Sequence, residues 1–171
     1  MNNLAHNVGK AAAPFVMIKR RRNRAPPQRE QDVMRFIVMV KANRDTEAGV
    51  MPTTEMIAAM SAFNEEMVKA GVMQAGEGLQ PTSKGARISY TGSAPDVIRG
   101  PFTGDLIAGF WLIEAGSLDE AVGWIKRAPF APGDAVEIRQ VLTAEDFGEA
   151  FTPELREQEE RLRGEVAARQ G

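Results

Sequence analysis

The order of strand and helix patterns between residues 34 and 148 constrains the fold of this chain more than any other feature. A β-branched-rich run at residues 35–41 precedes an amphipathic helical pattern, and a second strand pattern follows at 72–79. A hairpin pattern spans residues 86–99, and strand–helix–strand order then repeats from residue 106 to 142. Two such units form an antiparallel sheet with both helices on one face. The sequence therefore predicts an α+β fold with a ferredoxin-like split βαβ subunit and an inserted hairpin.

The most apolar run of the chain, residues 106–115, is typical of a central strand that is covered on both faces. Gly109 within this run indicates a bulge or a close packing approach. Ser117 and Glu120 have the spacing of a capping box and predict the start of the second helix. We expect the first helix to place one apolar face in the core, formed by Met56, Met60, Phe63 and Met67.

With both helices on one face, the other face of the sheet needs a cover. Two such sheets packed face to face bury it most simply, so we expect a homodimer that forms a dimeric α/β barrel. Residues 149–171 contain a charged C-terminal helix, which we expect from Phe151 to Gln170. Its narrow apolar stripe is expected to lean on the main body or on the partner subunit.

The first 33 residues differ in charge from the rest of the chain. They hold seven basic and two acidic residues, a net charge of +5, whereas the whole chain has −2 and the remainder therefore −7. We interpret residues 1–33 as a disordered basic leader; the alternative is an arm that binds nucleic acid. The acidic remainder argues against a nucleic-acid surface on the folded domain, which we expect to span residues 34–148.

Composition excludes several kinds of site. The chain has no cysteine and one histidine, His6, so thiolate or histidine metal clusters and cysteine nucleophiles are not expected. No dinucleotide or phosphate-loop motif is present, and we expect no cofactor. No apolar run is long enough to cross a bilayer, so we expect a cytoplasmic protein with no membrane partner.

A few charged residues could carry chemistry. Glu77, between two glycines, is the best candidate for a general base, and Asp105 in a short loop is the second. The alternatives are a solvated loop carboxylate and an ordinary turn residue. Four basic residues on or beside strands could bind a carboxylate or phosphate: Lys41, Arg87, Arg99 and Arg139. The adjoining Gly100, Pro101 and Phe102 either complete a ligand site or form a rigid turn with a packed aromatic ring.

Several segments together resemble the YCII-related family, also called DGPF-domain proteins. They include MRFIVMVKA at 34–42, GEGLQP at 76–81, RGPF at 99–102, LIAGF at 106–110 and EDFG at 145–148. The resemblance implies a ferredoxin-like subunit in a dimeric barrel, and it implies little about chemistry. The chain departs from the family where the acidic first residue of the RGPF motif is Arg99 and where the following loop shrinks to three residues. With no histidine in the domain, these departures argue against inherited catalysis.

Two functions stay open. The first is a non-catalytic or weakly ligand-binding dimeric module. The second is a small enzyme that transfers a proton on an anionic or aromatic metabolite. In that enzyme Glu77 or Asp105 would act as acid or base, and Arg99 or Arg139 would hold the negative charge.

Overall fold

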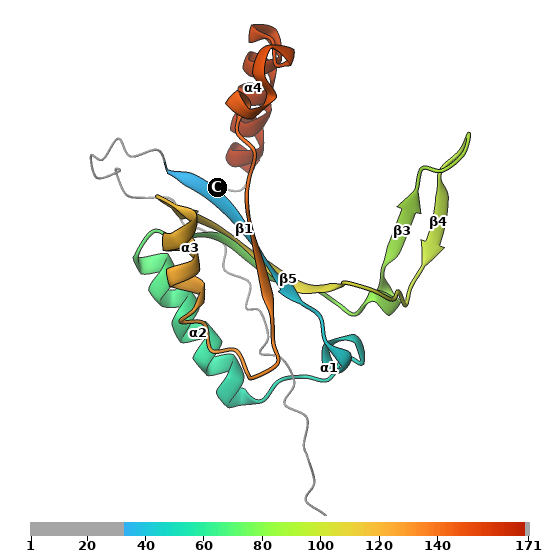
Figure 1. The fold of residues 1–171 in the computed structure, drawn as a ribbon, viewed down its shortest axis with the longest axis vertical. Helices are drawn as coiled ribbons and strands as arrows, with labels where there is room; N and C mark the ends of the chain where they lie inside the picture. Colours follow the sequence, from blue (N-terminus) through green and yellow to red (C-terminus); the bar gives the residue numbers. More distant parts are fainter. Residues whose placement is uncertain (1–32, 170–171) are drawn as a thin grey trace, which may run out of the picture.

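The computed structural model describes residues 33–169, and an antiparallel four-stranded sheet lies at its centre (Figure 1). The strand order is β2-β5-β1-β6, so β5 and β1 are central and each joins its neighbours in antiparallel pairs. This order results when two strand–helix–strand units interleave, which the sequence pattern predicts. The strands are β1 (Met34–Lys41), β2 (Met73–Gly78), β5 (Ile107–Ala115) and β6 (Val136–Gln140).

Helices α2 (Thr54–Lys69) and α3 (Leu118–Ile125) cover one face of this sheet (Figure 1). Trp111 on β5 is fully buried at the centre of the core, where its ring meets Phe63 and Phe130 edge to face. The predicted apolar face of α2 is confirmed. Met60, Phe63 and Met67 are buried, and Met56 is half-buried. The core contains Phe36, Val38, Val40, Met60, Phe63, Met67, Val72, Met73, Trp111, Ile113, Ala115, Ala121 and Ile125.

The start of α3 follows the predicted capping signal with one difference. The Ser117 hydroxyl accepts a hydrogen bond from the Glu120 N–H at 3.1 Å, as an N-cap should. The Glu120 carboxylate, however, accepts from the N–H of Gly116 at 2.8 Å and not from that of Ser117. The second hydrogen bond of a capping box, to the Glu120 carboxylate, is therefore donated by the residue before the N-cap.

The second face of the sheet carries no helix. Side chains of β5 alternate, with Trp111 and Ile113 buried while Phe110 and Leu112 are half-exposed on the other side. In the single chain β5 is therefore covered on one face, and the sheet stays open and does not close into a barrel. Cover of the second face by a partner subunit stays a prediction. The predicted irregularity at Gly109 is confirmed, since the pairing of β1 with β5 shifts register there.

The inserted hairpin forms a separate two-stranded sheet of β3 (Ala86–Ser89) and β4 (Asp96–Arg99). It extends away from the body of the molecule (Figure 1). Ile88, Val97 and Ile98 are each more than half exposed on it. A short 3-10 turn, η1 (Thr82–Lys84), precedes the hairpin.

Two short elements were not predicted, namely helix α1 (Arg44–Glu47) and the 3-10 segment η2 (Ala144–Ala150). The C-terminal helix α4 (Pro153–Arg169) begins two residues later than expected and projects from the sheet (Figure 1). Its apolar stripe does not lean on the main body, because all three members are exposed: Leu155, Leu162 and Val166. Cover by a partner subunit stays a prediction for this stripe.

The expected leader, residues 1–33, lies outside the described residues except for its last position. Within the described range 33–169, no helix combines the length and apolarity that a membrane span requires.

Candidate functional site

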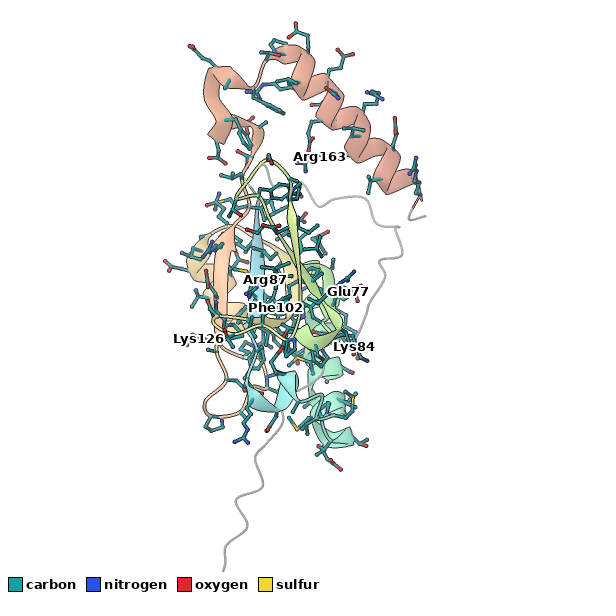
Figure 2. All side chains as sticks on the ribbon, turned by 90° about the vertical axis from the view of Figure 1, so that its right-hand side faces the viewer. Glu77, Lys84, Arg87, Phe102, Lys126 and Arg163 are labelled. Carbon is teal, nitrogen blue, oxygen red and sulfur yellow. The ribbon has the colours of Figure 1, made fainter. Side chains whose placement is uncertain are left out.

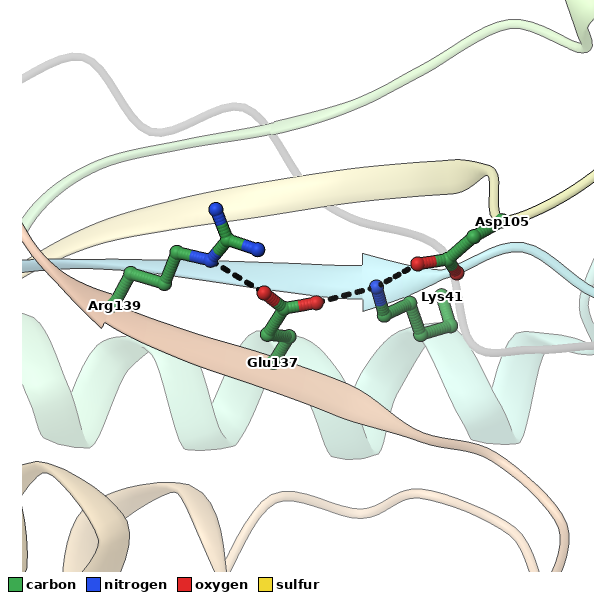
Figure 3. A network of polar contacts seen from close by, with 4 residues as sticks. All are labelled: Lys41, Asp105, Glu137 and Arg139. Atoms are coloured by element: carbon green, nitrogen blue, oxygen red, sulfur yellow. Dashed lines mark hydrogen bonds and ion pairs between the residues drawn. The ribbon is translucent and has the colours of Figure 1, made fainter.

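Four charged side chains meet at one edge of the open sheet face (Figure 3). The Lys41 ammonium lies 2.7 Å from the Asp105 carboxylate and 2.6 Å from that of Glu137. The second oxygen of Glu137 accepts a hydrogen bond from Arg139. Strand pairing explains this meeting, because β6 is the neighbour of β1 and places Glu137 opposite Met39 and Arg139 opposite Ile37. We call these four residues the charge network.

The charge network is electrically balanced, with two cations and two anions. Hydrogen bonds to Asp105 and then Glu137 raise the pKa of Lys41 above its ordinary value. Hydrogen bonds from Lys41 and then Arg139 lower the pKa of the Glu137 carboxyl. Lys41 and Glu137 are therefore held in their charged forms at neutral pH. A cation already paired in this way attracts a further anion weakly, and Glu137 is a poor proton acceptor.

An open groove of about 590 Å³ lies where the hairpin joins the body. At this groove the Arg87 guanidinium carbon sits 4.2 Å from the centre of the Phe102 ring, a cation–π contact. The two side chains lie together on the side of the molecule that carries the hairpin (Figure 2). Lys84 and Asp105 also line the groove, so Asp105 links it to the charge network. The groove therefore combines one flat aromatic ring with charges of both signs.

The turn from Gly100 to Phe102 is held by Thr82. A Cβ added at Gly100 would lie 1.7 Å from the Thr82 carbonyl oxygen, so only glycine fits at this approach. The N–H of Phe102 donates to the Thr82 hydroxyl oxygen at 3.0 Å, and that hydroxyl donates to the Glu47 carboxylate. The backbone of this turn is thereby tied to both η1 and α1. Pro101, which follows a cis peptide bond, is exposed.

Two of the predicted site residues lie apart from both features. Glu77 on β2 pairs with Phe110 on β5, and strands β5 and β1 separate it from β6. Among residues 33–169 its carboxylate makes no ion pair, and it does not line the groove. Arg99 lies exposed on β4 opposite Ala86. The structure thus joins Lys41, Asp105 and Arg139 in the charge network and Arg87 with Phe102 at the groove, and Asp105 belongs to both.

Sequence reasoning gave no role to Glu137, the centre of the charge network. Its alternation with Val136 and Ile138 does indicate a position on the open face, but the partner strand and its register are needed to find Lys41 beside it. It also missed Glu47 and Thr82, which hold the turn. Across the described part of the chain no three acidic or histidine side chains gather in a way that could hold a metal ion.

Comparison with protein-family models matches residues 34–145 to the YCII-related domain. The matched range contains the four-stranded sheet, helices α2 and α3, the hairpin, the groove and the charge network. Helix α4 lies beyond it. A comparison with curated proteins found no match.

Proposed function

This chain belongs to the YCII-related family, and from that membership and the geometry of its open sheet face we propose that it is a non-catalytic homodimeric module. In this proposal two ferredoxin-like subunits pack their open faces together as a dimeric α/β barrel. The role is assembly, and ligand binding is secondary to it. The observation that carries the proposal is the apolar centre of the open face.

Four apolar side chains form that centre, on the two central strands. Met39 pairs with Phe110 and Ile37 pairs with Leu112, so the four form one contiguous patch. All are only partly covered in the single chain. Burial of apolar surface contributes roughly 25 cal/mol per Å², and a two-fold contact lets the same patch cover itself.

The open face of the sheet is too small to form a stable dimer interface by itself. Strand spacing and rise make the open face roughly 20 Å by 20 Å, about 400 Å² in projection. A standard stable interface buries about 800 Å² on each partner. The exposed apolar side chains of the hairpin and of α4 are available to supply the difference. This also accounts for Ile88 and Leu162, which contact no core in the single chain.

The charge network fits the border of such an interface. Interfaces usually have an apolar centre and a polar margin, and charges that are already paired are cheaper to desolvate than single charges. The same pairing weakens the enzymatic alternative, because Arg139 and Lys41 are neutralised by carboxylates. Glu77 lies away from the basic residues with which it would have to act. No contact among residues 33–169 favours a proton-transfer site over the assembly role.

The experiment is analytical ultracentrifugation of the full chain and of Met39→Glu. The wild-type protein is expected to sediment as a dimer of the 18.7 kDa chain, and Met39→Glu as a folded monomer. Val68→Glu is the matched control, since Val68 is 43% exposed on the outer side of α2 and should leave the dimer intact. A monomeric wild-type protein, or a Met39→Glu protein as dimeric as the control, would refute the proposal.

A further inference from the structure

A cavity of about 230 Å³ lies on the helical side of the sheet. Its inner wall comes from buried or half-buried side chains of the core and the loop after α3, namely Val40, Met60, Trp111 and Phe130. Its outer wall is formed by loops next to α1 and after β2. Three apolar side chains there remain more than 40% exposed: Val50, Met51 and Leu79.

The walls of this cavity carry no charged side chain among the described residues that line it. The Thr46 hydroxyl is already occupied, because it accepts from the Asn43 N–H and donates to the Asn43 carbonyl, each at 2.9 Å. Gln80 is the other polar side chain of the lining, and its side-chain oxygen accepts from the Lys84 ammonium at 3.0 Å. A charged ligand would therefore lose hydration and find no opposite charge in the lining, which is costly. The chemistry of the walls selects a neutral ligand.

The aromatic part of the wall is fixed in place. The Trp111 indole N–H donates to the Asn64 side-chain oxygen at 3.0 Å within the core. The Trp111 and Phe130 rings lie 5.9 Å apart with planes at 75°. Aromatic rings favour edge-to-face and offset contacts, and a wall that is already ordered loses little entropy on binding. An aromatic ligand gains most from such a wall.

We propose that this cavity binds a neutral small molecule built on a single aromatic ring. The cavity volume of about 230 Å³ is large enough for such a molecule, because an apolar cavity of about 150 Å³ can hold benzene. The site lies on the opposite face of the sheet from the proposed dimer contact, so it does not depend on the dimer. It adjoins the groove at Phe102 and shares Leu79, Gln80 and Pro81 with it, but its lining lacks the charged side chains of that groove, which suit a polar ligand.

The test uses two probes of similar shape, 4-methylphenol, which is neutral at pH 7, and 4-methylbenzoate, which is an anion. Each is titrated into the ¹⁵N-labelled full chain while the two tryptophan indole N–H signals are followed by NMR. Trp124→Phe assigns the signals, because it leaves Trp111 as the single tryptophan of the chain. We expect 4-methylphenol to shift the Trp111 signal saturably, and 4-methylbenzoate to bind at least about tenfold more weakly.

A variant that fills the cavity locates the site. Val40→Phe places a larger side chain in the inner wall and should abolish the saturable shift, whereas Val68→Phe on the outer side of α2 should not change it. If Val40→Phe does not fold, nuclear Overhauser effects between 4-methylphenol and the Val40 methyl groups of the wild-type protein replace it. Equal binding of both probes, no saturable shift, or contacts only away from Val40 would overturn the proposal.

Discussion

The close approach of Gly100 to Thr82 permits a sharp test of how the hairpin is attached to the body. In Gly100→Ala the new Cβ would lie 1.7 Å from the Thr82 carbonyl oxygen and 2.6 Å from its carbonyl carbon. Both atoms belong to the backbone, and they cannot rotate away as a side chain would. The turn or η1 must therefore move, which strains the hydrogen bond from Phe102 to the Thr82 hydroxyl.

The expected loss of stability follows from two opposing effects. Overpacking of this kind costs about 1–3 kcal/mol, and the backbone contact places Gly100→Ala in the upper half of that range. Alanine also restricts the unfolded chain, which offsets roughly 0.4–1 kcal/mol. The net loss is about 1–2.5 kcal/mol, which lowers the melting temperature by about 2–10 °C for a chain of this length.

Gly92→Ala is the matched control within the same hairpin. A Cβ at Gly92 meets nothing within 4 Å, and its φ is not positive. Its melting temperature should stay equal to the wild-type value or rise slightly. Thermal unfolding followed by circular dichroism compares the variants, and hydrogen exchange of the Phe102 amide detects a loosening confined to the turn. Equal melting temperatures together with equal exchange of that amide would refute the steric argument.

Two further predictions concern the helix cap and the charge network. Ser117→Ala removes the N-cap of α3 and should cost about 1 kcal/mol, lowering the melting temperature by about 2–4 °C. Ser83→Ala, at an exposed position whose hydroxyl makes no hydrogen bond within residues 33–169, should change it little. Because Lys41 and Arg139 lower the folded pKa of Glu137, this carboxylate contributes stability above its ordinary pKa of 4.5 and loses it as pH falls through the lowered value. Glu137→Gln should therefore be less stable than wild type in urea at about pH 7, and the difference should shrink toward about pH 3; a difference that is constant with pH would contradict the ionic pairing.

The elements with a strong local signal could be predicted from the sequence. Helix α2 has apolar residues at helical spacing, and α3 follows a capping serine, so the apolar face of α2 and the start of α3 were both predicted. Helix α1 was missed because a four-residue helix has no periodicity, and its signal is only the Asn43 cap. The apolar run of β5 was correctly assigned to a central strand. The residues of this run alternate, however, between the buried face and the open face of the sheet. An uninterrupted apolar run does not show which of its two faces is covered.

The candidate site was predictable only in part, because it depends on pairing between distant strands. The sequence suggested Lys41, Asp105 and Arg139 as separate candidates, and Glu137 joins them only once β6 is placed beside β1. Glu77 was singled out for its flanking glycines, a local feature that does not reveal how far β2 lies from β6. The cavity beside Trp111 left no signal in the sequence, since its lining comes from six separate segments.

The central claim is that the open sheet face packs against the same face of a second copy. Isotope-filtered NMR on a mixed sample, with one half of the subunits labelled and the other half unlabelled, tests it most directly. The proposed dimer should give contacts between the Met39 methyl group of one subunit and the Phe110 or Leu112 side chain of its partner. Intersubunit contacts that leave Met39 out, or none at all at concentrations where the wild-type chain should be dimeric, would contradict it.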